Sequence, residues 1–205
     1  MHARSVATSN PRPIPRGLRN ARADDAILMR RIASGDKAAM HMLFSNHHVS
    51  VYRFVLRRLR DNALAEDVTS DVFLEVWRQA GRFEGRSAVL TWILAIARHK
   101  AFSVRPRFDQ LQFDEGQTEA DRDGADAPDE ILHMQDRSKV LRKCLTKLSA
   151  QHREIIDLVY YQEQSVEAVA TILGIPRNTV KTRMFYARRR LADELKRFGD
   201  DYASI

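Results

Sequence analysis

The sequence predicts an all-α protein with two small helical domains joined by a flexible acidic linker. Apolar residues recur at helical spacing over residues 24–105 and again over 136–198. Between them, residues 106–135 are acidic and lack an apolar pattern that could fold. Near the C-terminal end, a short helix, a glycine turn and a second, basic helix follow one another, which is the helix-turn-helix pattern.

Length, charge and cysteine content narrow the class of protein. The chain has 205 residues, enough for one large domain or two small ones, and its formal net charge of +7 favours a polyanionic partner. Cys144 is the single cysteine, so an intrachain disulfide is excluded, and we expect it to fill a core position. No apolar run approaches the roughly 18 residues of a membrane span. We therefore expect a soluble, cytoplasmic protein without membrane insertion.

Residues 1–23 predict a disordered basic tail. They contain several arginines, no acidic residue, and prolines at positions 11, 13 and 15 that interrupt a helix. Such a tail either adds non-specific attraction to DNA or is a solvated extension.

The N-terminal domain, residues 24–105, shows three apolar stripes that need one another for burial, so we expect a helical bundle. The stripes are Phe44, Val51, Phe54, Val55 and Leu59; Val68, Val72, Phe73 and Val76; and Leu90, Ile93, Leu94, Ala97 and Ala101. On the second helix, Asp67, Asp71 and Glu75 recur at i, i+4 and i+8. A row of like charges costs stability, which favours either a basic partner surface or a solvated face.

The third helix of this domain follows a loop, residues 81–87, that is bounded by glycines and contains Phe83. Ser87 is placed to cap the helix, and its later part is basic, with Arg98, His99 and Lys100. Such a combination can bind a nucleic-acid strand, because basic side chains contact the phosphate backbone and loop side chains contact unstacked bases. We expect Trp92, among apolar neighbours, to be a core residue rather than a stacking platform.

Residues 106–135 form the expected linker. This segment holds nine acidic residues against Arg107 and Arg122, a net charge of −7. The flanking domains are therefore more basic than the whole chain.

In the C-terminal domain, residues 136–198, polar caps mark each helix. Ser149 is placed to open a helix over residues 150–161, and Ser165 one over 166–173. Gly174 can take the left-handed conformation that ends the latter, and Pro176 suits the first position of the next helix. Residues 199–205 are expected to be a frayed tail.

The helix from residue 176 to 191 has the pattern of a helix that reads DNA. The apolar stripe that we expect to be buried consists of Val180, Met184, Ala187, Leu191 and Leu195. The opposite face and its flanks carry polar, basic and aromatic residues, and Phe185 at its centre is better explained as a contact residue than by burial. An ordinary helical hairpin with a solvated charged face is the alternative.

The sequence contains no catalytic constellation, so no catalytic residue, metal or cofactor is expected. Glu66, Asp67 and Asp71 share one helix without convergent ligands, and His41, His47 and His48 lack zinc-site spacing and are expected on the surface. A recombinase or nuclease is therefore disfavoured. A stand-alone helix-turn-helix regulator that binds operators by itself remains as the runner-up.

Taken together, the two halves resemble an extracytoplasmic-function (ECF, group 4) sigma factor of bacterial RNA polymerase. Residues 65–77 are similar to the family's polymerase-binding helix and residues 83–98 to its promoter-melting segment. Residues 148–161 and 174–191 match the domain that recognises the minus-thirty-five element. The family commonly has Gln, Asn and Ile-Asp where Ser70, His99 and Phe102-Ser103 stand, which bears on the minus-ten preference.

The resemblance implies partners and contact residues for a sigma-2-like N-terminal domain and a sigma-4-like C-terminal domain. The partners are core RNA polymerase, through its β′ coiled coil and β flap, promoter DNA and an anti-sigma factor. The linker lies where the family's linker runs toward the polymerase active-site cleft. Implied contacts are Asp67, Asp71, Phe73 and Trp77 for polymerase; Phe83, Glu84, Gly85, Arg86, Ser87, Ala88, His99 and Lys100 for the minus-ten element; and Arg177, Asn178, Lys181, Thr182, Phe185, Tyr186 and Arg189 for the minus-thirty-five element.

Overall fold

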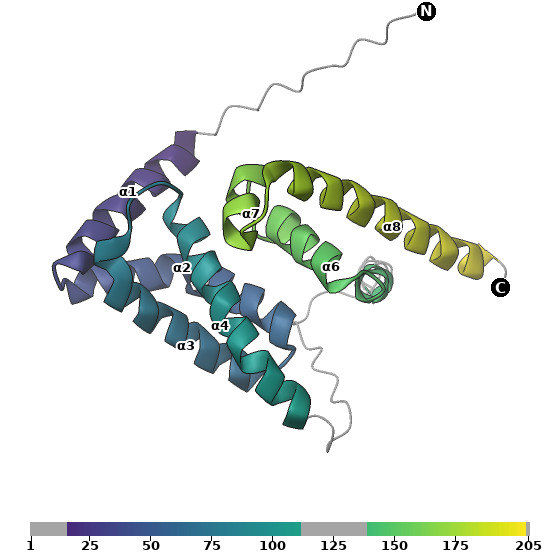
Figure 1. The fold of residues 1–205 in the computed structure, drawn as a ribbon, viewed down its shortest axis with the longest axis horizontal. Coiled ribbons are helices and arrows are strands. Elements are labelled where there is room, and N and C mark those ends of the chain that lie inside the picture. Colours follow the sequence, from purple (N-terminus) through teal and green to yellow (C-terminus); the bar gives the residue numbers. More distant parts are fainter. Residues whose placement is uncertain (1–15, 112–138, 204–205) are drawn as a thin grey trace, which may run out of the picture.

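The computed structural model describes residues 16–111 and 139–203, and within these ranges every regular element is a helix. The expected N-terminal tail up to residue 15 and most of the acidic linker lie outside the described residues. The helices are α1 (Arg16–Ala33), α2 (Lys37–Leu59), α3 (Asn62–Gln79), η1 (Ala80–Arg82), α4 (Val89–Leu111), a helical segment at 139–146, α6 (Ala150–Ile156), η2 (Asp157–Tyr161), α7 (Val166–Leu173) and α8 (Arg177–Ala203). The all-α prediction is confirmed (Figure 1).

The N-terminal domain is a bundle of α1 to α4, and local sequence sets where its helices begin. The Asp36 side chain caps α2 by accepting from the Ala39 N–H, and Asp61 caps α3 in the same way through Leu64. The predicted stripes face the core, where Phe54, Ile93 and their neighbours are fully buried. No helix among the described residues is long and apolar enough to cross a membrane.

Several element boundaries differ from the sequence expectation, and one of them is the end of α8, which runs to Ala203 through the residues expected to form a frayed tail. α1 begins at Arg16, directly after Pro15, because the proline-interrupted stretch ends there and the following residues permit a helix. α4 passes through Pro106 to Leu111, since proline removes one backbone donor but keeps a helical φ. Ser87 does not cap α4, because the helix begins at Val89 and the Ser87 hydroxyl donates to the Ala88 carbonyl at 3.3 Å.

The caps of the C-terminal domain follow the sequence closely. Ser149 and Ser165 accept hydrogen bonds from the N–H groups three residues later, as predicted. Gly174 ends α7 at φ +65°, in the left-handed region. Pro176 stands one place before α8, and its carbonyl accepts from the Val180 N–H at 3.2 Å. The helix expected over 150–161 instead changes at Asp157 to a π-helical turn, η2.

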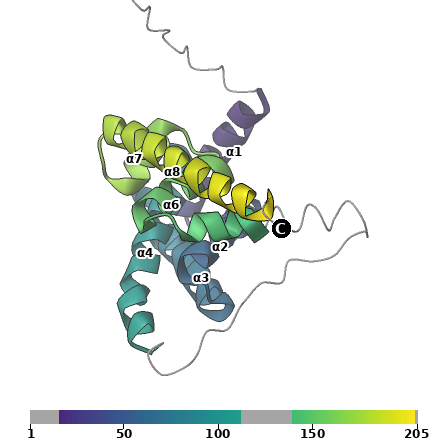
Figure 2. The same cartoon turned by 90° about the vertical axis from the view of Figure 1, so that its right-hand side faces the viewer.

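The two domains pack against each other. One apolar core extends from Leu28 in α1 to Val180 in α8, and a smaller one joins Leu148, Ile156 and Ala187. α7 lies against α4, and both views show α6 beside the N-terminal bundle (Figures 1 and 2). Cys144 is fully buried, as predicted for a core-filling cysteine.

Candidate nucleic-acid and polymerase interfaces

The α8 helix presents the contact face that the sequence predicts. All seven minus-thirty-five candidates are exposed, while Val180 and Ala187 on the opposite side are fully buried. Phe185 and Tyr186 are 58% and 52% exposed, and their rings meet edge to face with centroids 5.4 Å apart. The predicted apolar stripe is shorter than expected, because Leu195 is 38% exposed.

One of these candidates is held by an ion pair that sequence reasoning missed. The Arg177 guanidinium donates to the Glu167 carboxylate, which joins the start of α8 to the first turn of α7. A backbone hydrogen bond at Glu167 itself, followed by the Arg177 charge, lowers the pKa of this carboxyl below its usual value. Arg177 is therefore positioned by the turn, whereas no such pair holds Lys181 or Arg189 within the described residues.

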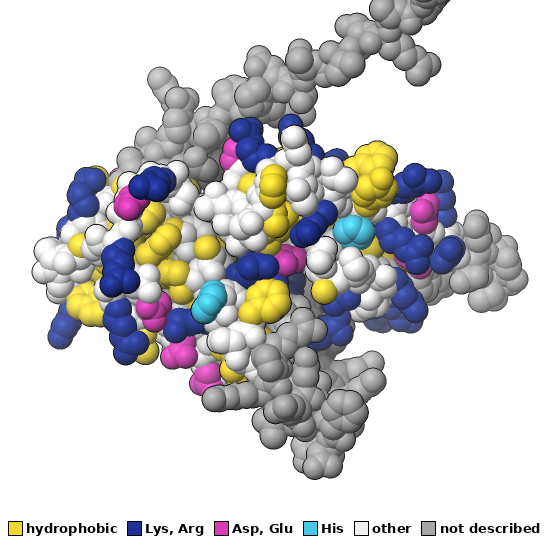
Figure 3. Space-filling view, viewed as in Figure 1, with side chains coloured by type: hydrophobic (Ala, Val, Ile, Leu, Met, Phe, Trp, Pro, Cys, Tyr) yellow, Lys and Arg dark blue, Asp and Glu magenta, His cyan; other side chains and the backbone are white. Residues whose placement is uncertain are grey.

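The α8 face is part of a basic surface. On the face seen in Figure 3, Lys and Arg side chains (dark blue) gather on the right-hand side, where α8 lies in Figure 1. One acidic residue of α8 offsets part of that charge, since Glu194 pairs with Arg190 at 3.1 Å and with Arg197 at 3.3 Å.

In the loop between α3 and α4, the polar residues are exposed, whereas the aromatic residue Phe83 is packed against its neighbours. Glu84, Gly85 and Arg86 are exposed, with Glu84 and Arg86 forming an ion pair of 2.5 Å. Gly85 has φ +71°, which glycine adopts without strain. Phe83 is half-buried against the Trp92 ring, with centroids 5.5 Å apart.

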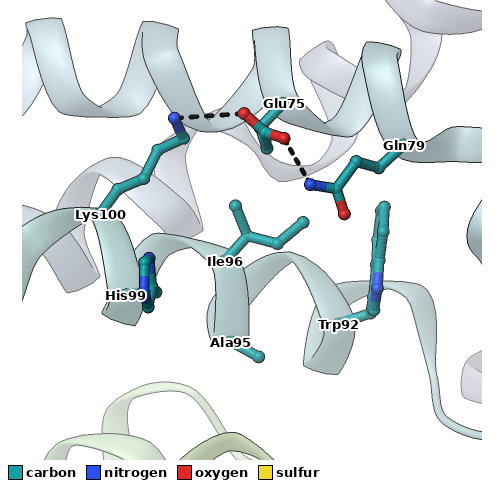
Figure 4. A pocket seen from close by; sticks show the side chains of 7 residues that line it. All are labelled: Glu75, Gln79, Trp92, Ala95, Ile96, His99 and Lys100. Carbon is teal, nitrogen blue, oxygen red and sulfur yellow. Dashed lines mark hydrogen bonds and ion pairs between the residues drawn. The ribbon is translucent and has the colours of Figure 1, made fainter.

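A groove of about 430 Å³ runs between α3 and α4 beside this loop (Figure 4). It brings together His99, which is exposed, and Lys100, both predicted for the minus-ten strand. Trp92 is half-buried: it packs against the hydrophobic core, as expected, and its remaining surface lines this groove. The remaining lining residues, which the sequence analysis did not assign to DNA, are Glu75, Gln79, Ala95 and Ile96.

Glu75 faces this groove instead of the row expected with Asp67 and Asp71. It accepts hydrogen bonds from Gln79 and from Lys100 at 3.4 Å, across from α3 to α4 (Figure 4). The Gln79 hydrogen bond, and then Lys100, lower the pKa of the Glu75 carboxyl. The acidic row fails because i, i+8 spacing drifts around a helix of 3.6 residues per turn, which carries Glu75 toward α4.

The predicted polymerase helix, α3, combines exposed acids with an apolar groove. Asp67 and Asp71 are exposed, but Phe73 is only 3% exposed and meets the Phe44 ring edge to face at 4.8 Å. Phe73 therefore lies beneath this surface and supports the residues that form it. The groove, of about 540 Å³, is lined by Lys37, Met40, Phe44, Ser70, Phe73, Leu74 and Trp77. Sequence reasoning missed Leu74, which is 53% exposed, although its place outside the predicted stripe of Val68, Val72, Phe73 and Val76 was a signal.

The histidines of α2 are not all on the surface, contrary to expectation. The ring of His47 lies 2.8 Å from an Asp25 carboxylate oxygen, and both side chains are largely buried. His48 packs against Phe44, with centroids 4.5 Å apart. Among the described residues, no group of His, Cys, Asp or Glu side chains is arranged to hold a metal ion.

Comparison with known proteins identifies the two halves. Residues 43–104 match the family model Sigma-70 region 2, and residues 144–193 match Sigma-70, region 4. Together these matches cover more than half of the chain. The chain belongs to the sigma-70 family. Its relatives place it among the ECF sigma factors: it is 32% identical to the ECF RNA polymerase sigma factor SigK of Mycobacterium tuberculosis, over 80% of this chain and 89% of that protein. It is 34% identical to SigL of the same species, over 82% of this chain and 94% of that protein.

Solved structures support the same fold for this ECF sigma factor. The structure of CnrH in complex with the cytosolic domain of CnrY matches with a TM-score of 0.62 at 23% identity, over 84% of this chain and 97% of that chain. The sigma factor RpoE, in its complex with the anti-sigma factor NepR from Bartonella quintana, matches with a TM-score of 0.57 at 28% identity. That match covers 76% of this chain and 96% of RpoE.

Proposed function

We propose that this ECF sigma factor directs promoter recognition and melting by binding alone, with no chemistry of its own. The observation that carries the proposal is the pairing of an exposed reading face on α8 with a separate loop and groove on the N-terminal domain. A stand-alone operator reader needs the first surface but not the second.

The minus-thirty-five element is proposed to bind α8 in its major groove. Exposed Lys181 and Thr182 can hydrogen-bond to base edges or phosphates, and Phe185 offers apolar contact to a thymine methyl group. Tyr186 supports Phe185 edge to face, which limits the conformations that Phe185 adopts before binding.

The minus-ten strand is proposed to bind at the α3–α4 loop and the adjoining groove. Capturing an unstacked base costs a few kcal/mol, which contacts in a pocket must offset. The half-buried Trp92 ring supplies an aromatic wall, while His99 and Lys100 supply polar contacts. Lys100 is held by Glu75, so its contribution to phosphate binding depends on that pair.

The core polymerase is proposed to bind the outer face of α3. Leu74 and Trp77 form an apolar centre in the groove, and Asp67 and Asp71 lie exposed on the same helix. An apolar centre with a charged rim is the usual anatomy of a protein interface. The groove thus supplies affinity and the acids supply orientation toward a basic partner.

An anti-sigma factor is proposed as the regulator, acting in the cytoplasm. The support is that the related RpoE was solved in complex with the anti-sigma factor NepR. For this chain, such a partner would act by covering the α3 groove or the α8 face.

Run-off transcription with and without core polymerase tests the proposed function. We expect transcripts from a restricted promoter set only when both are present. Leu74→Glu should abolish most of that activity, whereas Met42→Glu should not, because Met42 is equally exposed (51%) but lies outside the groove. Tight operator binding by the free protein, with no transcript from any promoter, would show that the protein is a stand-alone regulator.

A further inference from the structure

An ion pair spans the turn between α7 and α8, at the edge of the proposed reading face. Glu167 is the second residue of α7, and Arg177, ten positions later, is the first residue of α8. The Arg177 Nη2 nitrogen donates to the Glu167 Oε1 oxygen. Both side chains stay on the surface, 63% and 56% exposed. The N-terminal residues of a recognition helix are those that contact base edges, so this pair lies where α8 would first meet DNA.

The turn itself fixes the two partners relative to each other. The Gly174 N–H donates to the Ala170 carbonyl and ends α7 in the left-handed conformation. On the inner side of α8, Val180 is fully buried and belongs to the same apolar core as the inner side of α7. The backbones that carry Glu167 and Arg177 are therefore held by packing, and the pair needs no backbone change to form or to persist on DNA.

The Arg177 guanidinium keeps donors for a second partner. An arginine has five N–H donors, of which Glu167 takes one, and no other carboxylate within the described ranges pairs with Arg177. The remaining hydrogens on the two Nη nitrogens match the O6 and N7 acceptors of a guanine in the major groove, the commonest specific contact between arginine and DNA. The same donors would also fit a phosphate, a contact that carries no sequence information.

The Glu167 carboxylate favours the guanine over the phosphate. A hydrogen bond from its own backbone N–H, and then the charge of Arg177, lower the pKa of this carboxyl, so it is ionised at neutral pH. Its charge offsets the attraction of Arg177 to phosphates, which is independent of sequence. It also restricts the conformations of a long side chain before binding. In water an exposed pair is weak, but the pair strengthens where DNA excludes water.

We propose that Glu167 is a positioning residue that directs Arg177 to a guanine of the minus-thirty-five element instead of to a phosphate. The inference rests on the proposed function, because it requires α8 to read duplex DNA. It assigns a part in base choice to an acidic residue outside the reading helix. Lys181 and Arg189 lack such a carboxylate among the described residues, so they supply general affinity while Arg177 supplies discrimination.

Base choice is measured by transcription with the polymerase holoenzyme on templates whose minus-thirty-five region is randomised. We expect wild type to prefer guanine at one position and Arg177→Ala to lose that preference. Glu167→Gln should lower the preference at the same position by roughly two- to tenfold and leave the other positions unchanged. Glu167→Asp keeps the negative charge and should restore most of the preference.

Affinity for DNA without promoter elements should change in the opposite direction. Glu167→Gln should tighten binding of the holoenzyme to such a duplex by up to a few-fold and steepen its salt dependence by up to about one counterion. Asp193→Asn is the matched control, because it removes an exposed charge farther along α8. It changes the net charge equally and should leave the guanine preference unchanged.

A charge exchange separates base choice from support of the turn. Glu167→Arg combined with Arg177→Glu can restore the ion pair and with it the midpoint of thermal unfolding. The guanine preference should stay lost, because a carboxylate at position 177 accepts hydrogen bonds and cannot donate to O6 or N7. Recovery of the preference in this double variant would overturn the proposal.

The remaining outcomes are also decisive. An unchanged guanine preference in folded Glu167→Gln, or an equal loss at every position, would overturn the positioning role, and the latter would leave Glu167 as a support of the turn alone. A uniform weakening by Arg177→Ala across all sequences would assign Arg177 to a phosphate and overturn it likewise. Wild type without base preference anywhere upstream would instead refute the proposed reading function of α8, and this inference with it.

Discussion

The two helices proposed to contact promoter DNA, α8 and α4, differ in how their cationic residues are held. On α8, Lys181 and Arg189 are exposed and lack a carboxylate partner among the described residues. On α4, Lys100 is paired with Glu75, and Arg98 is paired with Glu154 of the other domain. The α8 surface is thus ready for DNA in the free protein, whereas the α4 surface competes with internal carboxylates. We therefore expect α8 to bind duplex DNA first, and α4 to bind the single strand only after its cationic residues separate from these carboxylates.

The largest expected effect comes from the exposed face of α8. Lys181→Ala or Phe185→Ala should weaken use of the minus-thirty-five element by about 1–3 kcal/mol if the side chain contacts a base edge. Transcription from matched templates with and without that element measures the effect, and Lys196→Ala, farther along α8, is the control. A loss of the same size on every template would assign the residue to phosphate contact and weaken the contrast between the two helices.

The next effect is a pH dependence at the contact between the two domains, where the Asp157 carboxylate pairs with Arg57. Burial raises the pKa of Asp157 to about 6, although Arg57 and Arg58 on α2 oppose the shift; Glu154 on α6 adds to it. The folded protein thus binds a proton more tightly than the unfolded chain, in which the carboxyl has its usual pKa of 3.8. The contribution of Asp157 to stability is complete below about pH 4 and is lost as the pH rises through 6. Acidification from pH 7 to 5 should favour the folded protein by about tenfold through this group.

Unfolding by denaturant at pH 5 and at pH 7 measures this dependence, and Asp157→Asn provides the comparison. Asparagine does not titrate, so the variant should lose most of the change between pH 5 and 7 while retaining the rest of the interface. An identical pH response in wild type and variant would assign the titration to another group.

The turn that sets the start of α8 should show a smaller effect, on stability. Gly174 has φ +65°, and an added Cβ meets no atom within 4 Å, so Gly174→Ala carries only the backbone penalty of about 1 kcal/mol. Thermal unfolding should show a midpoint lower by a few degrees. Gly81→Ala is the matched control, because Gly81 is equally open and has no positive φ. Equal midpoints for the two variants would mean that the turn relaxes without strain.

The α8 helix was also easier to predict from the sequence than the interface around α4. Caps such as Ser165 and Gly174, and the stripe through Val180, are local patterns that fix one helix at a time. The Arg98–Glu154 contact joins distant positions, and helical periodicity carries no information about such pairs. A signal was present, since Asp157 interrupts the apolar run from Ile155 to Leu158, and an acid within such a run needs a cationic partner. Periodicity likewise placed Glu75 in a row with Asp67 and Asp71, but it carried no information about the Lys100 partner of Glu75 on α4.

The smallest expected effect tests the pair that holds Lys100. Glu75→Gln removes the carboxylate charge while keeping a hydrogen-bonding side chain beside Gln79, so Lys100 becomes free for a phosphate. The pair is partly exposed, which limits the gain to about 0.2–1 kcal/mol, or a few-fold tighter binding of a single-stranded minus-ten oligonucleotide by the polymerase complex. The salt dependence of that binding should steepen by up to about one counterion. Glu66→Gln, an exposed charge removal on the same helix, controls for net charge. Equal tightening by both variants would mean that overall charge, rather than release of Lys100, governs the affinity, and the proposed contrast between α4 and α8 would then lose its basis at this residue.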